Sequence, residues 1–179
     1  DSLDPLPRDA LTRRELLGAL GGATAVAAVT QATAASPDTE RSTDRGERDL
    51  ASPLHFSSAT ALARAIRTKR LSAEEVTRAF LTRIRAVNPK LHAVVQVQWE
   101  AAVAEAREAD MRLMRGERLG PLHGVPITIK DSLDTAGIVS TAGTQGRAQF
   151  VPSRDASVVA RLKAAGAIVL AKSNTPELT

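Results

Sequence analysis

From about residue 55 onward, apolar residues recur at two spacings, one typical of amphipathic helices and the other of buried strands. Recurrence every three or four positions predicts four helices, which begin near Ser58, Ser72, Trp99 and Asp155. Short runs rich in β-branched residues predict strands over residues 93–97, 125–129 and 167–171. Because helices alternate with strands along the chain, we predict an α/β fold built in layers.

Polar residues at the expected helix ends support this assignment. Ser57 or Ser58 is placed to cap the first helix, and Ser72–Glu75 forms a capping box at the start of the second. The pair Asn88-Pro89 is expected to end that second helix, because proline cannot donate the next backbone hydrogen bond. Asp155 is expected to cap the last helix.

The first 34 residues follow a different pattern, with a charged start, a short and weakly apolar core, and small residues after it. Arg13 and Arg14 precede a stretch of Gly, Ala, Leu and Val over residues 18–29, and Ala32-Thr33-Ala34 follows. This order is typical of a secretory signal, and an arginine pair after a threonine resembles the twin-arginine export signal. We therefore expect residues 1–34 to be a twin-arginine-type signal peptide. The protein is then expected to be exported by the twin-arginine machinery, to the periplasm or the outside of the cell.

A helix that carries an incidental arginine pair is the alternative for this segment. A stable membrane anchor is not expected, because the apolar core is shorter than the ~20 residues that a spanning helix needs. Residues 35–54 contain Ser, Thr, Asp, Glu and Arg with few apolar residues. Such a composition cannot bury enough apolar surface to fold, so a disordered linker is expected there. The folded region is expected over residues 55–179.

Composition narrows the chemistry that the folded region can perform. Cysteine is absent from the 179 residues, which excludes disulfides and thiolate chemistry. A total of three histidines argues against a multi-histidine metal site. Aromatic residues make up 2% of the chain, so base-stacking surfaces for nucleic acid have almost no material. The net charge of +4 comes from interleaved acids and bases, a pattern that indicates a solvated surface rather than a nucleic-acid patch.

The stretch from Gly120 to Gly143 has the features expected of a catalytic segment. A Gly-Pro turn leads into the predicted strand 125–129, which delivers Lys130 and Asp131 into a glycine-containing loop. A lysine in water has a pKa near ~10.4, so a lysine that acts as a base at neutral pH has to be desolvated. A neighbouring carboxylate opposes this, because it favours the charged amine. A catalytic Lys130 therefore requires Asp131 to project away, onto backbone amides of the next loop. A surface lysine beside its own counterion is the alternative.

The spacing of the whole stretch resembles the amidase signature family of serine hydrolases, and the resemblance extends from about Ala59 to Thr179. The matching segments are Gly120-Pro121-Leu122-His123-Gly124-Val125-Pro126, Lys130-Asp131, Asp134-Thr135-Ala136-Gly137, Thr141-Ala142-Gly143 and the residues Lys172, Asn174, Pro176 and Glu177. The resemblance implies a mixed β-sheet core flanked by helices. Residues 55–179 would be the amino-terminal part of an amidase domain, truncated in this chain.

The resemblance also implies a mechanism, in which a Ser, cis-Ser, Lys triad hydrolyses an amide through an acyl-enzyme. Lys130 falls at the position of the family's lysine and would act as the general base. The family's nucleophile and cis-serine belong to a segment beyond Thr179, so Ser132, Ser140 and Ser173 are not assigned to either role. The fragment alone is therefore expected to be inactive. The expected substrate is a small carboxylic amide, and no metal or organic cofactor is implied.

Two other functions stay open. The amidotransferase that acts on charged transfer RNA with partner subunits has a component that shares these motifs, although an export signal argues against this function. A non-catalytic binding module on the same fold is the second. His123 is expected to be a surface or packing residue rather than a second base. The apolar helix stripes lack a complete sheet to cover, so the isolated polypeptide is expected to be unstable or to aggregate.

Overall fold

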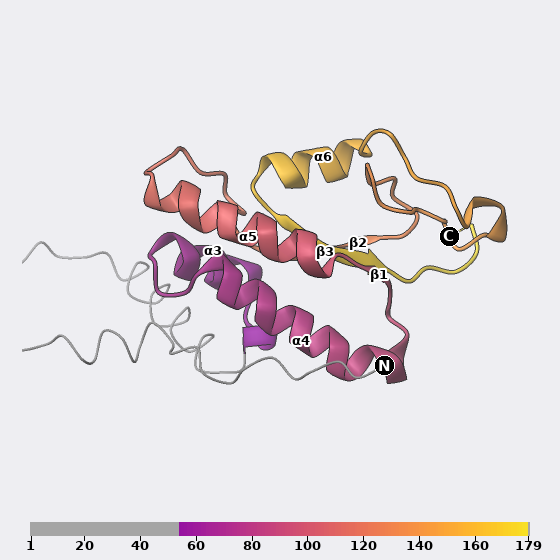
Figure 1. The fold of residues 1–179 in the computed structure, drawn as a ribbon, viewed down its shortest axis with the longest axis horizontal. Coiled ribbons are helices and arrows are strands. Elements are labelled where there is room, and N and C mark those ends of the chain that lie inside the picture. Colours follow the sequence, from indigo (N-terminus) through magenta and orange to yellow (C-terminus); the bar gives the residue numbers. More distant parts are fainter. Residues whose placement is uncertain (1–53, 179) are drawn as a thin grey trace, which may run out of the picture. The chain divides into compact units, whose positions relative to one another are not determined.

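A computed structural model describes residues 54–178 of the chain (Figure 1). The predicted signal peptide, and the predicted linker up to residue 53, lie outside the described residues. The elements of the described part follow one another in the order η1 (Leu54–Phe56), α3 (Ala59–Arg67), α4 (Ala73–Leu91), β1 (Val94–Val97), α5 (Trp99–Met114), β2 (Pro126–Lys130), η2 (Gln145–Arg147), α6 (Ser157–Ala164) and β3 (Ile168–Ser173). The mixture of helices and strands confirms the predicted α/β class.

The strands form one mixed sheet with β3 at its centre. The order is β1-β3-β2, with β1 antiparallel and β2 parallel to β3. The side chains of β3 alternate between two cores. Ile168 and Leu170 pack in the cluster that includes α4 and α5, whereas Val169 packs with Val159 of α6. Burial on both faces explains why the sequence of this strand is a continuous apolar run.

Helices α4 and α5 run side by side in Figure 1, and small residues allow their close contact. Ala102, Ala106 and Ala109 are the buried residues of α5 and belong to the main core. A polar contact also joins the two helices. The Asp110 carboxylate accepts the backbone N–H groups of Ala73 at 2.8 Å and of Glu74 at 3.1 Å, so α5 caps the first turn of α4.

Two of the predicted helix starts are confirmed. The Ser58 hydroxyl accepts the backbone N–H of Ala61 at 3.2 Å at the start of α3. The capping box at α4 is complete, because Ser72 accepts the N–H of Glu75 at 3.0 Å and the Glu75 carboxylate accepts the N–H of Ser72 at 2.9 Å.

Two other predicted helix ends are wrong. Helix α4 continues through Pro89 to Leu91 and ends at His92, whose φ of 49° is left-handed. Asn88 does not stop the helix, because its side chain instead binds the backbone N–H and C=O of Val94, each at 2.9 Å. Asp155 does not cap α6 either. Its carboxylate accepts the N–H of Ala136 at 2.7 Å, and the cap position is Ala156, which has no side-chain cap bond.

Candidate active site at the end of strand β2

Strand β2 ends in a strict alternation of side-chain environments. Ile129 is 3% exposed, Lys130 is exposed, and Asp131 is 2% exposed. Because successive strand residues point to opposite faces, Ile129 and Asp131 lie on one face of the sheet and Lys130 on the other. Ile129 packs against Val159, so the buried face is the one that α6 covers. Thr128 is exposed like Lys130, and the opposite face of β2 is therefore open.

The Lys130 amine is free for chemistry as far as the structure describes its surroundings. It makes no hydrogen bond or ion pair with any residue between 54 and 178. The sequence led us to expect that Ile127 and Ile129 would provide an apolar environment for this amine. That expectation is wrong, because both isoleucines pack toward α6 on the other face. The catalytic role of Lys130 stays a prediction, and desolvation of its amine would have to come from other segments.

Asp131 has the orientation that a catalytic Lys130 requires. Its Oδ2 accepts the backbone N–H of Thr141 at 3.0 Å and also the Thr141 hydroxyl. The carboxylate thus binds the loop that follows β2, as predicted, and does not pair with the Lys130 amine. The backbone N–H of Asp131 donates to Ser173 O at 2.9 Å, which extends the pairing of β2 with β3.

A second lysine, which the sequence analysis did not single out as functional, ends the buried part of β3. Lys172 is fully buried, and its Nζ donates to Thr135 Oγ1 at 3.0 Å, to Ser140 Oγ at 2.9 Å and to the Leu133 carbonyl. Burial lowers the pKa of Lys172 from its ordinary value, while the carboxylates of Asp131 and Asp134 act in the opposite direction. The available sequence signal was the same as for Lys130, an apolar run that ends in lysine.

The remaining polar candidates have structural roles. His123 is 4% exposed and its Nε2 lies 2.9 Å from Ala109 O, so it is a packing residue, as one of the two expectations held. Ser140 is 1% exposed and donates to Ile138 O at 3.1 Å. Within residues 54–178, His, Asp and Glu side chains form no group of three or more that could hold a metal ion. No helix in this same part of the chain is both long and apolar enough to cross a membrane.

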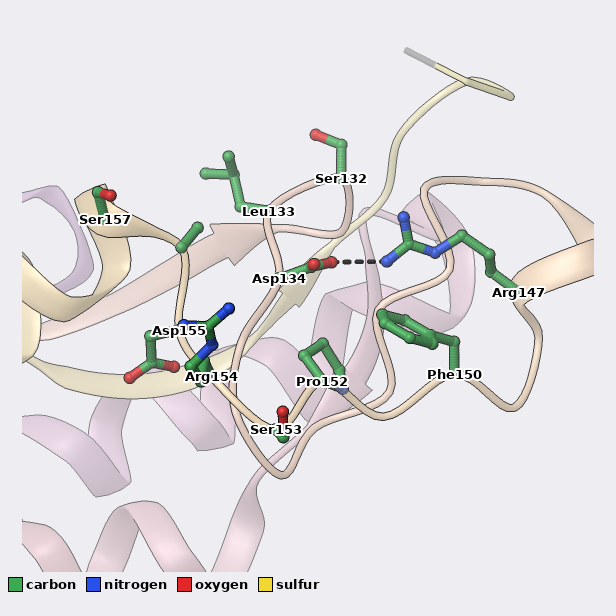
Figure 2. A pocket seen from close by; sticks show the side chains of 11 residues that line it. Ser132, Leu133, Asp134, Arg147, Phe150, Pro152, Ser153, Arg154, Asp155 and Ser157 are labelled. Atoms are coloured by element: carbon green, nitrogen blue, oxygen red, sulfur yellow. Dashed lines mark hydrogen bonds and ion pairs between the residues drawn. The ribbon is translucent and has the colours of Figure 1, made fainter.

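A hollow of about 620 Å³ lies beside the loop that Lys172 holds (Figure 2). An ion pair of 2.6 Å joins Arg147 and Asp134 across it, and the Arg147 guanidinium stacks 4.2 Å from the centre of the Phe150 ring. Asp155 and the start of α6 complete the lining. Neither lysine lines the hollow, so it is separate from the Lys130 amine.

Comparison with known proteins decides the family. Residues 75–179 match the family model described as Amidase. The chain belongs to the amidase family. It is 45% identical over 119 residues to a component of the glutamyl-tRNA(Gln) amidotransferase of Acidothermus cellulolyticus, its A chain. That match covers 66% of this chain and 24% of the relative. It is 42% identical over 124 residues to an acylamidase of Rhodococcus erythropolis, covering 69% of this chain and 26% of the relative.

Solved amidase structures share the fold of the described part. The native peptide amidase from Stenotrophomonas maltophilia matches with 36% identity and a TM-score of 0.63, over 67% of this chain and 25% of that one. A bacterial aryl acylamidase of the amidase signature family matches with 27% identity and a TM-score of 0.66, over 71% of this chain and 27% of that one. The resemblance to the amidase signature family is therefore confirmed. The chain spans about a quarter of the length of the curated relatives it matches.

Proposed function

We propose that the intact protein is an amidase, which hydrolyses a carboxylic amide to an acid and ammonia or an amine through an acyl-enzyme. Lys130 would be the general base and would also return a proton to the departing amine. The nucleophilic serine and the cis-serine would come from a segment that follows Thr179. The small-molecule substrate is an amide, and the hydrolysis needs no cofactor.

One observation supports this assignment most strongly, namely that the Lys130 amine is open while its neighbouring carboxylate is bound elsewhere. Thr128 and Lys130 leave one face of β2 exposed, so a serine-bearing segment could pack there within reach of the amine. Such packing would also remove water from Lys130, which a lysine base at neutral pH requires. Lys172, which also lies at a strand end, is fully buried and already donates to three oxygens.

The test is hydrolysis of a panel of small aliphatic, aromatic and peptide amides by the purified intact protein, with detection of the acid and the released amine. Lys130→Ala is expected to lower kcat/KM at least about 100-fold, in the range that general acid–base catalysis contributes. Lys90→Ala is the matched control, because Lys90 is an exposed lysine near the end of α4. Full activity of Lys130→Ala would remove Lys130 from the mechanism.

A second function is favoured by the relatives that are named as components of glutamyl-tRNA(Gln) amidotransferase. In that case the intact protein would act with partner subunits on charged transfer RNA, inside the cell. We propose export instead, from the Arg13-Arg14 pair and the apolar stretch after it. Replacing both arginines with lysine should retain the protein inside the cell. An unchanged location, together with amide transfer to glutamyl-tRNA by the purified protein and its partners, would favour the amidotransferase.

A further inference from the structure

Lys172 is the largest fully buried side chain among residues 54–178, and its surroundings are built for a charged amine. An ammonium has three N–H donors, and Lys172 uses them on the Leu133 carbonyl and the hydroxyls of Thr135 and Ser140. All three acceptors belong to the loop that follows β2. The amine thus links the end of β3 to the loop that begins with Asp131.

Asp131 lies on the same face of the sheet as Lys172. Ile129 pairs in register with Lys172, and Asp131 is two residues further along, so the three side chains point toward the α6 side. Thr141 binds Oδ2 of Asp131, whereas Oδ1 is buried and has no hydrogen-bond partner in the described part of the chain. A buried carboxylate with one unbonded oxygen depends on a nearby positive charge to stay ionised.

The charges around Lys172 identify that positive charge. Asp131 and Asp134 from the loop after β2, and Asp155 ahead of α6, favour its protonated form, while Arg147 of η2 disfavours it. Lys172 and Asp131 are the two members of this group that are almost completely buried. Each therefore offsets the charge of the other where water cannot.

We propose that Lys172 and Thr141 are positioning residues, which hold the Asp131 carboxylate on the α6 face of the sheet and so keep it away from the Lys130 amine on the opposite face. The inference rests on the proposed amidase function, in which Lys130 is the base. If either restraint were lost, the carboxylate could turn toward Lys130. It would then favour the protonated amine, and the base would become available only at higher pH.

The short distance from Ser140 to Lys172 also has the form of a Ser–Lys catalytic pair, but its surroundings exclude that role. Ser140 Oγ already donates to Ile138 O and accepts the N–H of Thr135 at 3.3 Å. With Ser140 1% exposed and Lys172 fully buried, a substrate carbonyl has no access to the hydroxyl. The contact is therefore part of the restraint on the loop.

The experiment uses the intact protein and compares Lys172→Met, Asp131→Asn and the double variant. In Lys172→Met, the acid limb of the pH profile of kcat/KM is expected to move up by about 1 pH unit or more, the smallest effect of a carboxylate at close range. Asp131→Asn and the double variant should keep the limb within about 0.3 units of wild type, because neither has a carboxylate that can turn. A purely structural Lys172 would lower activity in both Lys172 variants without moving the limb. That result would overturn the proposal.

Thr141→Val supplies a second test that does not disturb the buried amine. It removes one of the two bonds to Asp131 and keeps the backbone N–H, so the limb should move in the same direction by about 0.5 units. Thr144→Val is the matched control, because Thr144 lies in the same loop and its side chain makes no cap bond. An unmoved limb in Thr141→Val would contradict the proposal even if Lys172→Met failed to fold.

Stability separates this inference from the proposed function. If the two buried charges offset each other, the double variant should melt at a higher temperature than Lys172→Met, or fold where Lys172→Met does not. A double variant no more stable than Lys172→Met would overturn the pairing. If the wild-type protein hydrolysed no amide, or Lys130→Ala stayed fully active, the proposed function would fail and the positioning role with it, while the stability comparison would still report on the pair.

Discussion

Lys130 and Lys172 end two neighbouring strands of one sheet, yet their surroundings are opposite. Lys130 pairs in register with Ser173, and Lys172 with Ile129, so the two lysines are offset by one residue and point to opposite faces. One amine is exposed, whereas the other is fully buried and bound by three oxygens. A register offset of one residue therefore separates a lysine available for chemistry from a lysine that holds the scaffold.

The comparison shows why burial alone is a poor guide to a catalytic lysine. A buried ammonium whose three donors are all bonded acts as a cross-link, and a substrate cannot displace those bonds without unfolding the loop. An exposed amine with an adjacent but diverted carboxylate keeps its lone pair accessible once other segments remove water. Substitutions at and around the two lysines separate these roles.

The largest expected effect is on activity, in Lys130→Arg. Arginine keeps the positive charge but cannot lose its proton at any accessible pH, so it cannot serve as a base. We expect kcat/KM for amide hydrolysis to fall about 1,000-fold, with the melting temperature unchanged. Retention of activity within about tenfold would mean that the charge at this position matters rather than the base.

The next effect is on stability, in Lys172→Met compared with Lys130→Met. Removal of the buried amine leaves three acceptors and the Asp131 carboxylate without their partner, which should cost about 3 kcal/mol or more in unfolding free energy. Lys130→Met should change it by less than about 1 kcal/mol. Denaturant unfolding of the intact protein measures both. Equal losses would break the distinction between the two lysines.

A smaller effect is expected in the loop that carries Thr141. Gly143 has a φ of +74°, and a Cβ there would lie 2.6 Å from Pro176 O, whereas Gly137 has a φ of +76° and open space. Gly137→Ala should cost about 1 kcal/mol from the backbone alone. Gly143→Ala should cost about 2 kcal/mol more, because the clash with Pro176 is added. Similar losses in both variants would show that this loop is not packed against the chain after β3.

The smallest expected effect concerns acid stability on the Lys172 side of the sheet. Burial works against the charged form of Asp155, but the Ala136 N–H and the Lys163 ammonium outweigh it, so the pKa of Asp155 lies below its ordinary value. Its contribution to stability is present above about pH 4 and is lost as pH falls through the lowered value. The difference in unfolding free energy between wild type and Asp155→Asn should therefore narrow below about pH 4. A difference that stays constant with pH would contradict this role.

The repeating apolar pattern predicted most of the fold, because periodicity reports burial directly. Strands β2 and β3 were expected over residues 125–129 and 167–171, and they occupy Pro126–Lys130 and Ile168–Ser173. The two wrong helix ends depend on contacts distant in the chain. The Asn88 side chain binds Val94, and the Asp155 carboxylate binds Ala136, neither of which local propensity can reveal.

The candidate site was predicted in part. The position of Lys130 at a strand end and the diversion of Asp131 onto the next loop followed from spacing and from the alternation of strand side chains. The same alternation places Ile127 and Ile129 on the other face, away from the amine. The role of Lys172 could not be predicted, because the register that brings it beside Asp131 is a tertiary property of the β2–β3 pair.

Chemical rescue of Lys130→Ala in the intact protein tests the central claim most directly, that the open amine of Lys130 is the working base. Hydrolysis of the best amide substrate is measured with and without added ethylamine, whose free base can occupy the space of the missing side chain. We predict that the variant is nearly inactive alone and that ethylamine restores turnover, increasingly so as pH rises and more free amine is present. Wild-type turnover by Lys130→Ala without any added amine would contradict the account.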